Sequence, residues 1–88
     1  MHKLTFSDSV KCATTIEITE FLKNNKSELN LNGIAIGLVI DILTTLDWIL
    51  DTIEYDPYVV CMWNFKDIIT IYCDKFSRNL TIKRQCQE

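Results

Sequence analysis

The chain has 88 residues, enough for one small domain. Its composition, 48% hydrophobic and 24% charged with two Gly and one Pro, excludes an intrinsically disordered or collagen-like chain. Nine basic and twelve acidic residues give a net charge of −3, which disfavours a nucleic-acid-binding surface.

The longest apolar stretch runs from Ile34 to Leu50 and is interrupted by Asp41 and Asp47. A charge at the centre of a bilayer costs at least about 2.5 kcal/mol, so we do not expect this stretch to span a membrane. The first residues lack the long apolar segment of a secretory signal. We therefore expect a soluble, cytoplasmic protein.

The N-terminal part is predicted to form a strand and then a helix. The strand is expected at Lys3–Phe6, followed by a Ser-Asp-Ser turn. Thr14 or Thr15 is suited to cap the helix, which is expected to end at Asn24. Three apolar residues within it recur at helical spacing, although an alternating Ile pair leaves a hairpin as the alternative.

The segment Ile34–Tyr55 gives the strongest helix prediction. Its apolar residues recur every three or four positions and form one wide face. The helix is expected to end at Asp56–Pro57, because Pro lacks a backbone donor and the residue before it avoids helical angles.

The last third is predicted to contain two strands with a helix between them. Tyr58–Trp63 is apolar at almost every position, which is typical of a strand covered on both faces. Asn64 can cap a helix over Phe65–Phe76, but the β-branched run Ile68–Ile71 leaves a strand as the alternative. Leu80–Lys83 is predicted to be the closing strand.

The order strand, helix, helix, strand, helix, strand implies crossover connections, which join parallel strands. We therefore predict a single α/β domain over residues 1–88, with a small three-stranded parallel sheet packed by about three helices. The alternative is an α+β fold with an antiparallel meander. The residues expected in the core are Leu43, Leu46, Leu50, Val60 and Ile69.

Residue types suited to catalysis or metal binding are sparse. The cysteines are far apart in the sequence, and His2 is the only histidine. A structural zinc site needs closely spaced ligand pairs, and a catalytic triad needs an ordered histidine beside a nucleophile. We therefore expect no metal, no cofactor and no enzymatic activity. The four thiols, expected to be free in a reducing compartment, are Cys12, Cys61, Cys73 and Cys86.

Charge is segregated along the chain. No Lys or Arg occurs between Lys26 and Lys66, whereas this stretch contains six acidic residues. On a helical wheel, Trp48 and Tyr55 lie with Asp41 opposite the apolar face. Exposed aromatic rings among carboxylates are typical of a binding surface, although a merely solvated helix face is the alternative. The six acids are Glu28, Asp41, Asp47, Asp51, Glu54 and Asp56.

Three features of the sequence resemble one known family. Gly33 precedes Asp41 by eight positions, the segment Asp41–Ile49 reads DILTTLDWI, and Val59–Asn64 is a Val-rich strand that ends in Trp-Asn. Together they resemble the barstar family of small intracellular inhibitors that neutralise a secreted ribonuclease. In that family a Gly opens the second helix, and an inhibitory Asp follows eight residues later.

The resemblance implies an inhibitor or immunity protein whose acidic helix masks the basic active site of a nuclease, with Asp41 in place of a phosphate. The alternative is a non-enzymatic viral or phage interaction module with the same fold and another partner. We expect a basic protein partner, no nucleic acid and no membrane, and a monomer or weak dimer. The predicted partner-binding residues are Asn32, Gly33, Gly37, Asp41, Thr44, Thr45, Trp48 and Asp51.

Overall fold

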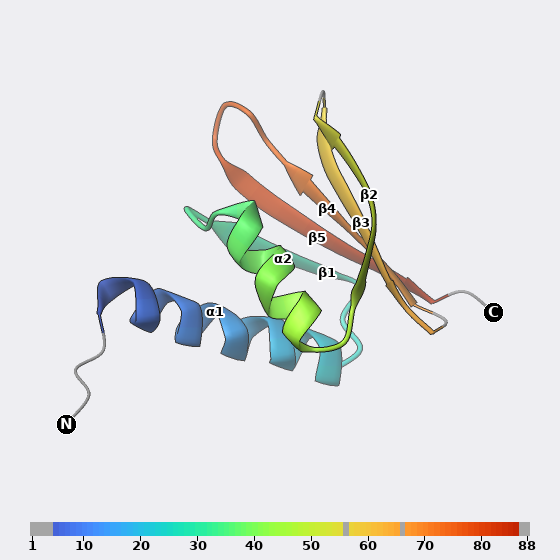
Figure 1. Ribbon diagram of the computed structural model, residues 1–88, viewed down its shortest axis with the longest axis horizontal. Helices are drawn as coiled ribbons and strands as arrows, with labels where there is room; N and C mark the ends of the chain where they lie inside the picture. Colours follow the sequence, from blue (N-terminus) through green and yellow to red (C-terminus); the bar gives the residue numbers. More distant parts are fainter. Residues whose placement is uncertain (1–4, 56, 66, 87–88) are drawn as a thin grey trace.

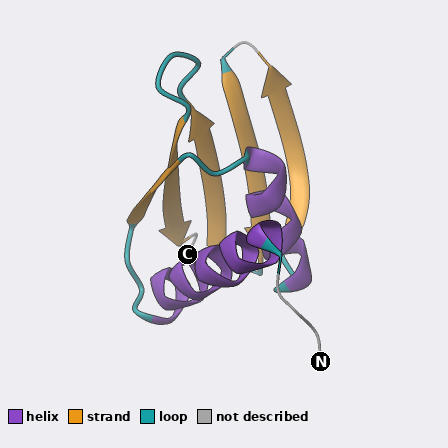
Figure 2. Cartoon of the chain, turned by 90° about the vertical axis from the view of Figure 1, so that its left-hand side faces the viewer, coloured by secondary structure: helices purple, strands orange, loops and turns teal. Residues whose placement is uncertain are grey.

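A computed structural model describes residues 5–55, 57–65 and 67–86. This part of the chain forms two layers, a five-stranded antiparallel sheet and two helices on one of its faces (Figures 1 and 2). In chain order the elements are α1 (Phe6–Lys23), β1 (Glu28–Asn32), α2 (Ile36–Thr45), β2 (Ile49–Tyr55), β3 (Tyr58–Asn64), β4 (Asp67–Cys73) and β5 (Asn79–Cys86). The prediction of a three-stranded parallel sheet with three helices is therefore wrong, and the architecture is α+β.

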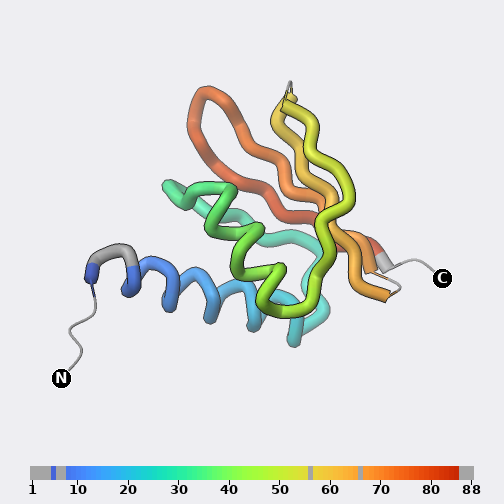
Figure 3. The backbone as a smooth tube through the Cα atoms, viewed as in Figure 1, coloured from blue at the N-terminus to red at the C-terminus, as the bar shows by residue number. Residues whose placement is uncertain are grey.

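The order of the strands across the sheet is β1-β5-β4-β3-β2, and every neighbouring pair is antiparallel. Strands β2 to β5 form a meander, and the first part of β5 pairs with β1, which lies in the first half of the chain (Figure 3). Strands β1 and β2 are consequently the two edges. Parallel neighbours were expected only because a helix was assigned between the last two strands, where the chain instead forms β4.

Helix α1 begins much earlier than predicted. Thr5 is its N-cap, and its hydroxyl accepts from the backbone N–H of Asp8, while the Asp8 carboxylate accepts from the N–H of Thr5. This capping box starts a helix where a strand over Lys3–Phe6 was expected. Residues 1–4, including His2, lie outside the described ranges. The predicted end at Asn24 is confirmed, since this residue is the C-cap.

Helix α2 ends ten residues before the predicted end, at a Schellman motif. Asp47 has a positive φ of 70°, which turns the chain out of the helix. The N–H of Trp48 donates to the carbonyl of Leu43 (2.9 Å), and the N–H of Asp47 donates to the carbonyl of Thr44 (3.1 Å). The predicted helix over Ile34–Tyr55 is thus α2, a turn and strand β2.

The core lies between the helices and one face of the sheet. Leu43, Val60 and Ile69 are buried as predicted, but Leu46 is only half-buried and Leu50 is 43% exposed. Leu50 was expected on the apolar face of a long helix, whereas it lies on the edge strand β2. The buried hydrophobic residues are Ile18, Phe21, Leu31, Val39, Ile42, Leu43, Trp48, Val60, Met62, Ile69, Ile71, Leu80 and Ile82.

Candidate functional site

The second face of the sheet carries no described helix (Figure 2). Apolar side chains on this face are exposed. Strands β3 and β4 alternate, so that Val60 and Met62 are buried under the helices while Cys61 and Trp63 point to the uncovered face. The expectation that this strand is covered on both faces is therefore wrong. We call the helix-free side the open face.

One end of the open face carries a row of apolar side chains. Ile49 of β2, Trp63 of β3 and Ile68 of β4 lie directly opposite one another in the strand register. Ile49 is 51% exposed and Trp63 42%. Beside this row, the hairpin between β3 and β4 turns at Phe65, whose side chain is 97% exposed. We refer to Ile49, Trp63, Phe65 and Ile68 as the open-face cluster.

The open-face cluster borders three hollows. Trp63 and Phe65 both line two of them, one of about 230 Å³ and the other of about 320 Å³. Phe65 also lines the third, of about 760 Å³, together with Lys23 and Arg84. Asp51 lies in the wall of the first, and Asp47 in the wall of the second. The described residues that line the first two hollows include no Lys or Arg, and neither Asp47 nor Asp51 forms an ion pair with another described residue.

Phe65 has a backbone conformation that does not suit its side chain. Its φ is 52°, in the left-handed region that Gly, Asn and Asp adopt most readily. It occupies the first position of the two-residue connection between Asn64 and Asp67, where hairpins prefer Asn or Gly. Because the ring is also solvent-exposed, neither backbone preference nor core packing accounts for a Phe at this position.

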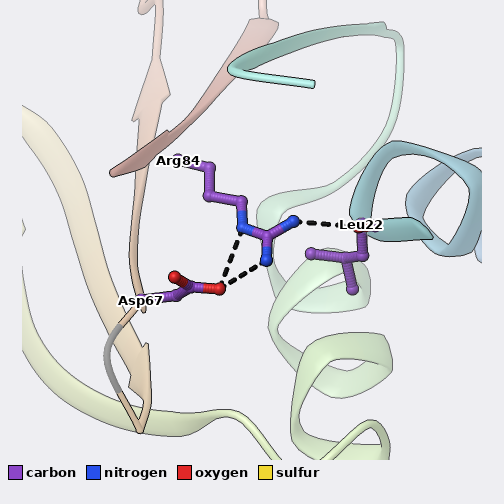
Figure 4. A network of polar contacts seen from close by, with 3 residues as sticks. All are labelled: Leu22, Asp67 and Arg84. Atoms are coloured by element: carbon purple, nitrogen blue, oxygen red, sulfur yellow. Dashed lines mark hydrogen bonds and ion pairs between the residues drawn. The ribbon is translucent and has the colours of Figure 1, made fainter. Parts of the chain in front are cut away.

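The base of this turn is held by a side-chain network (Figure 4). The Nε atom of Arg84 donates to Asp67 Oδ2 (3.1 Å), and its Nη2 atom forms an ion pair with the same oxygen. The Nη1 atom donates to the carbonyl oxygen of Leu22 at the end of α1 (2.9 Å). Arg84 therefore ties β5 to the β3–β4 turn and to the first helix, which fixes the position of Phe65.

A second exposed Phe provides a comparison. Phe76 is 97% exposed in the connection between β4 and β5, beyond the opposite end of β4 from Phe65. Its backbone N–H donates to Asp74 Oδ1 (2.9 Å), which lowers the pKa of the Asp74 carboxyl group. Phe76 lines neither of the two hollows beside Trp63.

The sequence-predicted binding residues lie in several separate parts of the fold. Gly37, Asp41, Thr44 and Thr45 are exposed on α2, where the two Thr hydroxyls donate to backbone carbonyls of their own helix. These residues do not line the hollows beside Trp63.

The other predicted binding residues lie elsewhere. Asn32 ends β1 and Gly33 follows it with a φ of 70°, both exposed. Asp51 lies beside Trp63, as described above. Trp48, expected on a solvent-facing helical surface with Tyr55, is 5% exposed in the core. The cause is the Schellman turn, which directs Trp48 back over Leu43.

Sequence reasoning missed Trp63 and Phe65 as surface residues. The run Val59–Trp63 is apolar at every position, so its residue types do not distinguish the two faces of the strand. Nothing in the sequence indicates that Phe65 is exposed, because its helical spacing from Ile69 also fits a residue on the buried face of a helix.

The described residues contain no group of three or more His, Cys, Asp or Glu side chains placed to hold a metal ion. Cys12 is exposed, and Cys61 and Cys73 are half-buried; all three are free thiols. In the part of the chain that the structure describes, neither helix has the length and hydropathy needed to cross a bilayer.

Comparison of the chain with family models, with curated proteins and with solved structures gave no match.

Proposed function

We propose that this chain is a non-enzymatic interaction module that binds a basic partner protein through the open-face cluster. The observation that carries the proposal is Phe65, an exposed aromatic side chain held at a positive φ beside Trp63. Residues with strained backbone angles cluster at functional sites, where the surrounding structure maintains them. Aromatic rings also dominate the energetics of protein interfaces.

Charge supports a basic partner. None of Asp41, Asp47, Asp51 and Glu54 forms an ion pair with another described residue, and all four are exposed. Asp47 and Asp51 flank the aromatic rings. Carboxylates in such a position attract a cationic surface and accelerate its association. The proposal includes a cytoplasmic setting, in which the free thiols Cys12, Cys61 and Cys73 would stay reduced.

The test is capture of the partner by matched variants of the full chain. Immobilised wild type, Trp63→Ser and Phe76→Ser are exposed to a lysate of the source cells, and bound proteins are identified by mass spectrometry. We expect wild type and Phe76→Ser to retain a basic protein. The amount retained by Trp63→Ser should be lower by at least about tenfold. Retention should also fall as salt rises above ~0.15 M, because screening weakens exposed charge pairs.

Equal retention by all three chains would contradict the proposal, provided that unfolding shows Trp63→Ser to be folded. An Asp41→Ala variant distinguishes binding through the open face from the narrower hypothesis of a barstar-like nuclease inhibitor. Loss of a nuclease with Asp41→Ala, and not with Trp63→Ser, would move the binding surface from the open face to α2.

A further inference from the structure

Strand β2 lies at the edge of the sheet, yet it carries apolar side chains on both of its faces. The pairing register directs Ile49 to the open face and Leu50 to the helix-covered face. Ile49 is 51% exposed, Leu50 43% and Tyr55 71%. An edge strand with exposed apolar side chains is a template for pairing with a further strand.

The other edge strand, β1, is built differently. Leu29 and Leu31 face the helices, and Leu31 is buried, while the polar residues Glu28, Asn30 and Asn32 occupy the open face. The Asn30 side-chain oxygen accepts from the hydroxyl of Thr81 on β5 (3.1 Å). This alternation is the ordinary pattern of a strand with one covered face, and its exposed polar side chains make β1 the less suitable edge for a further strand.

The backbone of β2 can pair with one more strand. Among the described strands it pairs with β3 alone, so about every second residue of β2 directs its N–H and C=O away from the sheet. Addition of an extended peptide to such an edge is a recurrent mode of recognition. The edge is continuous with the open-face cluster, because Ile49 belongs to both.

We infer that β2 is completed by an extended segment of the partner protein that carries Lys or Arg at alternate positions. This inference rests on the proposed function, whose surface it extends. Asp51 and Glu54 are exposed on β2, and β2 itself contains no cation. Basic side chains on the added strand would lie beside these carboxylates, and opposite charges on adjacent strands stabilise pairing.

The same charges disfavour a second copy of this chain as the added strand. Antiparallel pairing of two β2 strands would bring Asp51 and Glu54 of each copy toward the same acids of the other, and facing like charges destabilise a strand pair. The register shift between Leu50 and Thr52 also bends the first part of β2 at Asp51. The added segment is therefore expected beside residues 52–55.

A synthetic eight-residue peptide in which Val and Lys alternate tests the inference with the full chain. Binding is followed by amide chemical shifts, and strand formation by hydrogen exchange. We expect the outward-directed amides of residues 52–55 to exchange more slowly with the peptide present, and those of Glu28–Asn32 to be unchanged. The variants Asp51→Lys and Glu54→Lys should each weaken binding several-fold, and together on the order of tenfold.

Glu28→Lys is the matched control, since it makes the same charge change on the opposite edge, and binding should stay within about twofold of wild type. Protection of β1, equal loss with Glu28→Lys, or shifts without slowed exchange in β2 would overturn the inference. Self-association of the free chain through β2, detected by sedimentation, would also overturn it. If any of these results is obtained but capture of the partner still requires Trp63, the proposed function is supported and only the addition of a strand is contradicted.

Discussion

Replacing Trp48 with Ala is expected to lower the free energy of unfolding by about 3–5 kcal/mol. The indole is 5% exposed between α2 and the sheet, and the Schellman turn fixes its backbone against Leu43. The substitution removes a large buried side chain and leaves a cavity in the core of a small domain. Because small domains are stabilised by only about 5–15 kcal/mol, much of the variant would be unfolded near physiological temperature.

Trp63→Ala is the matched control, since it removes the same side chain from the open face. It should cost about 1 kcal/mol, as Trp63 is 42% exposed. Urea unfolding measures the difference in the free energy of unfolding between the two variants. If Trp48→Ala does not fold, Trp48→Phe is measured in its place. An equal decrease in the free energy of unfolding for the two Ala variants would contradict the burial of Trp48 and support the surface position that the sequence predicted.

Arg84→Ala is expected to cost about 2–3 kcal/mol, the second largest effect. It leaves the Asp67 carboxylate and the Leu22 carbonyl, both in a partly buried site, without their guanidinium donor. Lys at this position should recover less than half of the loss, because a single ammonium group does not reproduce the geometry with which Arg reaches two acceptors.

A double-mutant cycle with Asp67→Ala measures the coupling between the two side chains. Their coupling energy should exceed about 1 kcal/mol by urea unfolding. Lys83→Ala, at the neighbouring exposed position of β5, should cost no more than about 1 kcal/mol. Additive losses in Arg84→Ala and Asp67→Ala would show that the network does not hold the turn.

Those parts of the fold with a simple local signal could be predicted from the sequence. Strand β3 was predicted from its apolar, β-branched composition, and the end of α1 from its paired Asn residues. The alternative of an antiparallel meander was also recognised, from the β-branched run in β4. A helix is the first expectation for this segment because Phe65 and Ile69 are four residues apart. That spacing places two residues on one face of a helix, but it also places them on one face of a strand.

The boundary between α2 and β2 could not be read in the same way. Helices that end in a Schellman motif most often place Gly in the left-handed position, and here that residue is Asp47. Without a Gly or Pro, the apolar spacing continues past Thr45 into Ile49 and Ile53. Trp48 was consequently assigned to a helical surface, although the turn directs it inward.

The candidate site was partly anticipated. The absence of cations between Lys26 and Lys66 pointed to an acidic surface with aromatic residues, and Asp51 does lie beside an exposed Trp. That Trp is Trp63, which lies on the sheet face that no described helix covers. Trp48 is buried because the turn after α2 directs it into the core. The positive φ of Phe65 is a property of the folded turn, which residue type alone does not reveal.

Retention of the partner by Phe65→Asn tests most directly whether Phe65 serves recognition rather than folding. Asn tolerates the left-handed conformation, and the 97% exposed ring contributes no core packing, so unfolding should require as much free energy as wild type or about 0.5–1 kcal/mol more. Capture by the same variant should fall at least about tenfold. A Phe65→Asn chain that is folded and retains the partner as well as wild type would contradict the open-face binding surface.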